Sequence, residues 1–388
     1  MRYSDSIFGR LLKPISRRKF EASVERHEGD AYDKTFGSFD HLVTLVYAQL
    51  GGIGSLRALE AVWNAHANHH YHLGVGRIAR STMSDANQRR PAAVFAGAFA
   101  ELSRLADRSV KREGAAMLRL IDATPIPLGE LASWAQWNGR TRGLKLHVVY
   151  NPRLDHPRQI AITPSTVNDV EVGRDVPIEK GASYVFDKAY CDYSWWTKIN
   201  DAKAFFVTRP KTNVQHKVLR RRQLHKRKGD GFTVRSDCEV ALRSKNSRSK
   251  LPFTLRRLRI RRETGGWLTI ITNDLKRPAV RIAALYKERW QIELLFRWIK
   301  QHLAIKKFLG RSENAVRLQL IAAMIAYLLL RIAARETRLK IPAIRFADLV
   351  ASSLFARKPI HAIDKPPPIN PSKPRPRYPA TQLELNYA

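Results

Sequence analysis

The chain has 388 residues, of which 69 are Lys or Arg and 34 are Asp or Glu, so its formal charge at pH 7 is +35. Such an excess repels itself unless a polyanion neutralises it, which excludes an ordinary small-molecule enzyme as the first interpretation. The composition is 44% hydrophobic and 9% aromatic, which excludes a disordered basic tail and allows a sizeable core in two or three domains.

Cysteine usage and hydropathy indicate the compartment. Only two cysteines are present, Cys191 and Cys238, so a disulfide framework and a four-thiolate zinc site are excluded and a reducing cytoplasm is expected. The N-terminal segment lacks the apolar core of a secretory signal. The longest apolar run, 320–330, is well short of the roughly 20 residues of a membrane helix. We therefore expect a cytoplasmic, nucleoid-associated protein that does not enter a membrane.

Residues 1–110 are predicted to form a helical DNA-binding domain. Apolar residues recur at helical spacing in 40–50 and in 55–66, and two glycines separate these segments. A third capped segment, 81–90, ends before a proline and carries Arg89 and Arg90. Short helices that lead into a basic helix are typical of a helix-turn-helix domain, although plain helical bundles share the pattern. Arg89 and Arg90 are therefore candidate DNA contacts.

The middle of the chain is predicted to be mostly β-structure. Short β-type runs occur at 118–128, 144–152, 159–165, 183–190, 204–210 and 267–274, and the first three suit an antiparallel meander. A short helix is possible between Ser194 and Ala202, and longer helices are expected at 280–303 and 317–339. Strands followed by helices predict an α/β (α+β) fold, with one mixed sheet flanked by helices.

Positive charge is concentrated between Arg209 and Arg262, where 19 Lys and Arg accompany 3 Asp and Glu and supply +16 of the net +35. Alternating stretches inside this region are typical of strands with one wet face, so we predict a basic, β-rich insertion at 209–265 within a catalytic region of 111–340. The remaining residues, 341–388, are predicted to be a helix and a mobile tail, since 8 of the 20 prolines fall in the last 32 residues.

Three acidic residues stand out by their context. Asp122 lies inside an apolar strand, where a carboxylate is costly unless a positive charge meets it. Asp187 ends another apolar strand, and Glu293 lies in the long helix. If the fold brings them together, the three would make an all-oxygen site for Mg²⁺ or Mn²⁺. Two such ions can activate a water or a 3′-hydroxyl and stabilise the leaving oxygen of an in-line phosphoryl displacement.

The predicted glutamate helix has two faces. At 100° per residue, Tyr286, Arg289, Glu293 and Lys300 share one narrow stripe, beside a separate apolar face. Weak surface ion pairs would explain the charged residues, but not the tyrosine among them. We expect Arg289 and Lys300 to hold DNA phosphates, and Tyr286 to contact the strand through its hydroxyl or by stacking.

Other residues compete for these roles. Asp192 could be the second ligand. Asp187 is preferred, because an acid directly after a strand has a better defined direction than one further into a loop. Asn273 and Asp274 could orient a ligand, although a helix cap is the commoner role for them. Lys145 and His147 lie on one face of a strand and could approach a phosphate, which an ordinary sheet surface explains equally well.

Two further groups of residues, one of histidines and one of aromatics, are explained without a functional role. The histidines at 66, 69, 70 and 72 have no cysteine or acid at zinc-finger spacing, so a polar loop is the preferred interpretation. Phe232, Phe253 and Trp267 could stack on extruded bases, but core packing accounts for each one taken singly.

The stripe resembles a known signature. The spacing Tyr286-x₂-Arg289-x₃-Glu293-x₆-Lys300 matches every position of the Y-R-E-K signature of bacterial insertion-sequence transposases with a D-D-E triad. The segment that starts at Asp122 resembles the first-aspartate strand of that family. The segment 187–190 resembles its second, usually written D-R-G-Y, with Lys and Ala in place of the customary Arg and Gly.

The resemblance runs from about 115 to 335 and implies a ribonuclease-H-like core with a β-rich insertion before the glutamate helix. It also implies a cut-and-paste transposase. Such an enzyme frees a 3′-hydroxyl at the end of the element, forms and reopens a hairpin, and joins the element to target DNA.

The implied ligands are two Mg²⁺ or Mn²⁺ ions on Asp122, Asp187 and Glu293. The implied partners are double-stranded DNA and a second copy of the chain in a synaptic homodimer. Two alternatives stay open: a non-catalytic DNA-binding or architectural protein derived from a transposase, and a stand-alone structure-specific nuclease.

Overall fold

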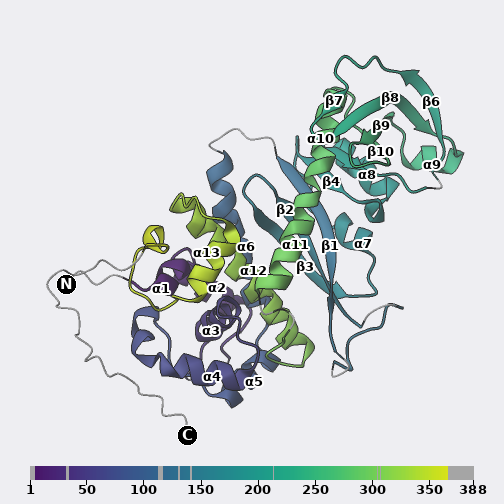
Figure 1. Ribbon diagram of the computed structural model, residues 1–388. Helices are drawn as coiled ribbons and strands as arrows, with labels where there is room; N and C mark the ends of the chain where they lie inside the picture. Colours follow the sequence, from purple (N-terminus) through teal and green to yellow (C-terminus); the bar gives the residue numbers. More distant parts are fainter. Residues whose placement is uncertain are drawn as a thin grey trace, which may run out of the picture.

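The computed structural model describes residues 5–31, 35–111, 117–129, 132–139, 142–212, 214–303, 305 and 307–365. A helical layer lies at one end of the molecule and a long twisted sheet extends from it (Figure 1). The proline-rich tail predicted for the end of the chain lies outside the described residues from 366 onward.

The helical layer draws on both ends of the chain. It contains α1 (Ile7–Leu12), α2 (Arg17–Arg26), α3 (Ser38–Leu50), α4 (Leu56–Ala65), α5 (Arg80–Arg89), α6 (Ala92–Lys111), α12 (Glu313–Glu336) and α13 (Ala343–Ala351). The Ser55 hydroxyl caps α4 by accepting from the Ala58 N–H at 3.2 Å, as the sequence suggests. Helix α12, which the sequence assigns to the end of the catalytic region, packs on α3 and α6.

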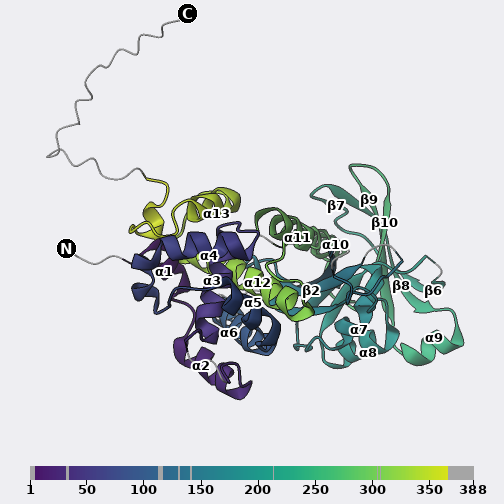
Figure 2. The ribbon, with the colours of Figure 1, turned by 90° about the horizontal axis from the view of Figure 1, so that it is seen from below.

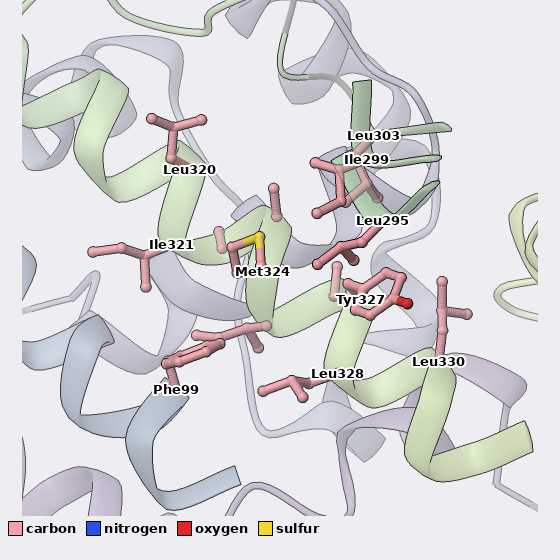
Figure 3. Packing of buried hydrophobic residues seen from close by; sticks show 14 of the residues in the cluster. Phe99, Leu295, Ile299, Leu303, Leu320, Ile321, Met324, Tyr327, Leu328 and Leu330 are labelled. Carbon is pink, nitrogen blue, oxygen red and sulfur yellow. The ribbon is translucent and has the colours of Figure 1, made fainter. Parts of the chain in front are cut away.

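Helix α12 is the centre of this layer. It is the one helix in the described ranges that is long and apolar enough to cross a membrane, but 89% of its most apolar window is buried inside the protein. Phe99 of α6 lies on one side of it, and Leu295 and Ile299 of α11 (Trp290–His302) gather on another, with Leu303 directly after that helix (Figure 3). The indole of Trp298 meets the Tyr327 ring edge-on, with 4.9 Å between centroids. These contacts fix α11, the glutamate helix, against the helical layer.

The strands of the described residues form one mixed ten-stranded sheet, ordered β3-β2-β1-β4-β5-β10-β9-β8-β6, with β7 paired to β8. The strands are β1 (Leu118–Pro127), β2 (Gly143–Asn151), β3 (His156–Pro164), β4 (Ser183–Phe186), β5 (Phe205–Thr208), β6 (His216–Arg221), β7 (Lys228–Gly229), β8 (Phe232–Leu242), β9 (Leu255–Arg262) and β10 (Trp267–Thr272). The first three form the expected antiparallel meander, whereas β4 and β5 run parallel to β1. This mixed sheet, with helices packed against it, confirms the predicted α/β (α+β) fold class.

The basic segment between β5 and β10 extends the same sheet. Strand β10 pairs with β5 on one side and with β9 on the other, so the inserted strands continue the core sheet edge to edge. A buried ion pair holds the insertion: Arg256 and Asp237 are each 2% exposed and lie 2.7 Å apart. Arg256 also donates to the carbonyl of Arg277, just before α10 (Ala279–Glu288).

Helices cover both faces of the sheet. Helices α10 and α11 cross one face, with α10 against β4, β5, β8 and β9 and α11 against β1. On the other face lie α7 (Asp169–Arg174), α8 (Tyr193–Asp201) and α9 (Lys245–Lys250) (Figure 2). The predicted helix between Ser194 and Ala202 is thus α8. Two apolar clusters, one on each face, hold these layers together.

Candidate active site

Asp122 lies in the middle of β1, at the point where this strand passes under α11. Alternate residues of β1 face opposite sides of the sheet, and its neighbour Ile121 belongs to the apolar cluster on the α8 side. Asp122 therefore faces α11. Its side chain is 20% exposed, and its Oδ1 accepts a hydrogen bond from the Ala123 N–H at 2.9 Å.

Asp187 is the first residue after β4. Because β4 runs parallel to β1 with Phe186 opposite Ile121, the next residue along each strand is an aspartate, Asp187 beside Asp122. The Asp187 Oδ1 accepts from the Lys188 N–H at 2.6 Å and starts a short 3-10 turn that leads the chain away. The strand pairing thus brings the two aspartates to the same part of the sheet.

Glu293 reaches the site from α11. The predicted single helix is divided at Arg289, which separates α10 from α11 and has a helical φ of −53° and ψ of −31°. Hydrogen bonds of the tighter i to i+3 type flank this residue, from the Arg289 N–H to the Tyr286 carbonyl and from the Ile292 N–H to the Arg289 carbonyl. The break leaves Arg289 and Glu293 on the same side of the helix, above β1.

Arg289 joins two of the three carboxylates. Its Nη1 donates to Asp122 Oδ2 at 3.3 Å, and its Nη2 donates to Glu293 Oε1 at 2.5 Å. The guanidinium is only 18% exposed. One cation therefore connects Asp122 of β1 to Glu293 of α11. A carboxylate inside an apolar strand is costly to bury unless a positive charge meets it, and Arg289 supplies that charge.

The pKa of Asp122 reflects the two other acids. It is raised to about 6, chiefly by burial and also by the negative charges of Asp187 and Glu293, against the Ala123 N–H and the Arg289 charge, which lower it. Both other acids therefore lie within electrostatic range of Asp122. The structure thus connects Asp122 to Glu293 through Arg289, and to Asp187 through the pairing of β1 with β4.

Tyr286 lines the site, whereas Tyr190, which the sequence did not single out, packs in the apolar cluster on the α8 side of the sheet. Tyr286 is buried, the Arg289 guanidinium lies 5.9 Å from its ring centre, and burial raises the pKa of its hydroxyl. Tyr190 is 1% exposed; burial raises the pKa of its hydroxyl, and the charges of Asp122 and Asp187 add to the effect. Within the described ranges neither hydroxyl has a hydrogen-bond partner. The sequence could have drawn attention to Tyr190 through its position, because it ends the segment 187–190 that begins with Asp187.

Three of the predicted DNA contacts are engaged inside the fold, which corrects the sequence analysis. Arg90 is 3% exposed and donates to the carbonyls of Gly37, at 2.8 Å, and Phe36. His147 is 4% exposed and bonded to the Thr163 hydroxyl, and burial lowers its pKa to about 4, so it is neutral at pH 7.

Lys145 is the third of these residues. Its Nζ lies 3.0 Å from the Asp169 carboxylate and donates to the Val167 carbonyl. Phosphate contact would need each of these partners to be given up. By contrast, Arg89 is exposed at the end of α5, and Lys300 is partly exposed on α11.

The competing residues have structural roles. Asp192 caps α8 by accepting from the Trp195 N–H at 2.7 Å, and it pairs with Arg174. Asp274 is 1% exposed and caps the turn before α10, as the sequence indicates, while the Asn273 side chain accepts from the Phe206 N–H.

The histidine-rich segment packs against aromatic rings. The rings of His66 and His69 lie 4.5 and 5.1 Å from that of Phe355, and His70 stacks on Trp63 at 4.3 Å. Of the aromatics in or beside the insertion, Phe232 is buried, whereas Trp267 is 49% exposed between Arg259 and Arg261.

The chemistry of the triad fits a divalent cation. Its donors are all carboxylate oxygens, the preferred ligands of Mg²⁺ and Mn²⁺, and the space between Asp122 and Glu293 already holds a positive group. In the part of the chain that the structure describes, no group of three or more His, Cys, Asp or Glu side chains is arranged to hold a metal ion. The type of donor thus suits the ion, but the three carboxylates are not gathered around one point in this structure, and Arg289 lies between Asp122 and Glu293.

Comparisons with known proteins identify the family of the chain. Residues 113–329 match the family described as "Transposase DDE domain", and residues 4–76 match a domain of unknown function (DUF4372). The Sinorhizobium fredii protein y4zB, named as a transposase, is 60% identical over 79% of this chain and 85% of its own length.

Two further matches are weaker. A Geobacillus stearothermophilus protein, named as a transposase for insertion sequence element IS5377, is 32% identical over 55% of this chain and 56% of its own. Among solved structures, a piggyBac transposase synaptic complex with hairpin DNA covers 95% of this chain and 84% of that chain, with a TM-score of 0.48 and 8% identity.

Proposed function

Since the chain belongs to the DDE transposase family, we propose that Asp122, Asp187 and Glu293 are the catalytic triad of this DNA transposase. As a member of the family, the protein catalyses metal-dependent cleavage and strand transfer in DNA transposition. One observation supports the assignment above all: Asp122 and Glu293 share the Arg289 guanidinium, while Asp187 and Glu293 both raise the pKa of Asp122.

The proposed cofactor is a pair of Mg²⁺ or Mn²⁺ ions on these three carboxylates. When bound, such ions supply the activated hydroxyl and stabilise the leaving oxygen of the phosphoryl displacement. The protein supplies the orientation. Strands β1 and β4 fix Asp122 and Asp187 side by side, and α11, held by its apolar face on α12, fixes Glu293 above them. Buried Tyr286 excludes water from the inner wall.

DNA is proposed to approach from the open side of α11. Arg289 and Lys300 lie on that helix and would contact phosphates next to the triad, with Tyr286 behind them. The helices of 1–110, with Arg89 exposed on α5, are proposed to bind the ends of the element, and the basic insertion to bind flanking DNA. We further propose a homodimer that pairs two ends, in the cytoplasm at the nucleoid.

The test uses supercoiled plasmid DNA that carries the genomic flanks of the gene. Asp122→Asn, Asp187→Asn and Glu293→Gln should each abolish Mg²⁺-dependent cleavage, because each removes a charged ligand. Duplex binding, measured by fluorescence anisotropy, should change less than about threefold, since no phosphate contact is lost. Asp192→Asn is the matched control, because this acid follows the same strand but caps α8.

Each outcome decides between the candidate functions. Cleavage that survives in one triad variant removes that residue from the triad. Cleavage by the wild-type protein without joining to target DNA would indicate a structure-specific nuclease. Binding with no cleavage under any metal condition would indicate an architectural protein. A complex with one protein copy on two paired ends would contradict the homodimer.

A further inference from the structure

The Arg289 guanidinium occupies carboxylate oxygens of Asp122 and Glu293 that a metal ion would need as ligands. Its guanidinium lies 3.3 Å from Asp122 Oδ2 and 2.5 Å from Glu293 Oε1, and the side chain is 18% exposed. Its buried Nε has no hydrogen-bond partner in the part of the chain that the structure describes. The guanidinium is thus held by the two carboxylates on one edge and is unsatisfied on another.

A guanidinium and a divalent cation cannot both use these oxygens. Mg²⁺ requires oxygens at about 2.0–2.1 Å in near-octahedral directions, and an N–H donor on the same lone pair blocks such an approach. Loading of an ion between Asp122 and Glu293 therefore requires Arg289 to withdraw. Its position favours withdrawal, because Arg289 lies at the break between α10 and α11 and carries a long, flexible side chain.

A withdrawn Arg289 needs a new anion. Its planar fork of donors matches a phosphate as well as a carboxylate, and phosphate diesters are what the DNA substrate brings to this site. The free Nε and the two Nη groups together present donors along one side of the guanidinium. A phosphate can therefore replace both carboxylates without leaving the arginine unpaired.

We propose that Arg289 is an exchange residue that makes metal loading depend on DNA, an inference that rests on the triad assigned above. Without DNA, Arg289 neutralises Asp122 and Glu293 and keeps divalent cations weakly bound. When a DNA phosphate arrives, Arg289 transfers to it and the two carboxylates become available to the ion. The chain is thereby held inactive until substrate is bound, which limits metal-dependent cutting by the free protein.

Linkage makes this coupling measurable from either side. If DNA raises the affinity for the ion, the ion raises the affinity for DNA by the same factor, about 5- to 150-fold for typical coupled sites. Arg289 is a positioning residue in this scheme, since it acts on the ion through the carboxylates. Its removal should uncouple the two ligands.

The experiment measures Mn²⁺ binding to the full-length, metal-free chain by isothermal titration calorimetry and by the electron paramagnetic resonance signal of free Mn²⁺. Arg289→Gln should bind Mn²⁺ at least about tenfold more tightly than the wild type in the absence of DNA. Arg297→Gln is the matched control: Arg297 is an exposed arginine on the same helix whose guanidinium lies 5.8 Å from the Trp290 ring. It should bind Mn²⁺ like the wild type.

A short duplex supplies the second half of the test. It should tighten Mn²⁺ binding to the wild type and to Arg297→Gln, but change Arg289→Gln by less than about twofold. Arg289→Lys retains the charge but can face one carboxylate at a time, so its Mn²⁺ affinity should lie between those of the wild type and Arg289→Gln. This second variant keeps the test valid if Arg289→Gln misfolds. Equal or weaker Mn²⁺ binding by both Arg289 variants, without DNA, would overturn the proposal.

The triad itself is tested separately. The double variant Asp122→Asn, Glu293→Gln should lose the tight Mn²⁺ site with and without duplex, and its residual signal corrects for ions bound by DNA. If the double variant binds Mn²⁺ like the wild type, the metal ligands were assigned wrongly. If it loses binding while Arg289→Gln gains none, the ligands stand and only the exchange role of Arg289 fails.

Discussion

Asp122→Asn should stabilise the metal-free protein at high pH. The pKa of Asp122 is raised from 3.8 to about 6, so the folded state holds this proton more tightly than the unfolded state. The ionised carboxylate therefore destabilises the fold above pH 6, and this cost disappears as the pH falls towards 3.8. Since each tenfold difference in proton affinity corresponds to about 1.4 kcal/mol, the full cost is about 3 kcal/mol, of which about half develops between pH 5 and pH 8.

The assay compares melting temperatures at pH 5 and pH 8 in the presence of a chelator, followed by the fluorescence of the eight tryptophans. The advantage of Asp122→Asn over the wild type should be about 1–3 °C larger at pH 8 than at pH 5. Taking the difference between two pH values cancels any pH-independent effect of the substitution. Asp201→Asn, at the exposed end of α8, should show the same change in melting temperature between pH 5 and pH 8 as the wild type. An advantage that is constant, or larger at pH 5, would refute the electrostatic account of the site.

Three other substitutions test the fold and the DNA surface. Asp237→Ala leaves the buried Arg256 unpaired and should destabilise by about 3–5 kcal/mol, so an unchanged melting temperature would contradict the burial of this pair. Gly143→Ala places a Cβ 2.2 Å from the Ile126 carbonyl oxygen and should lower the melting temperature by several degrees; wild-type stability would show that β1 and β2 are not so close. Lys300→Ala should reduce the salt dependence of DNA binding by about one counterion, and an identical slope argues against a phosphate contact there.

Local pattern was sufficient to predict most elements. The spacing of apolar residues places α3 and α4, and Ser55 marks where α4 begins, because these features act over a single turn. The glutamate helix was also predicted, but its break at Arg289 was not. A short change to i to i+3 bonding leaves the apolar spacing intact, so periodicity alone cannot reveal it.

Burial of polar residues was the main source of error. Arg90 and His147 were predicted to face DNA because each lies in a segment with a polar face and a basic or hydrogen-bonding side chain. Arg90 instead satisfies the carbonyls of Phe36 and Gly37, and His147 bonds to Thr163 of the adjacent strand. Both partners are distant in sequence, and tertiary contacts of this kind leave no local signal.

The sheet order explains how the proposed triad, which comes from three separate segments, can tolerate a large insertion. Asp122 and Asp187 are fixed by the pairing of β1 with β4, which involves no inserted residue. The inserted strands leave at the far edge of β5 and return through β10, which pairs with β5 itself. The chain therefore re-enters the core beside the place where it left, and α10 and α11 start from there across the sheet towards β1. The inserted strands β8 and β9 also support α10, so the insertion contributes to the position of the glutamate helix, whereas the strand pairing that sets Asp122 beside Asp187 is independent of it.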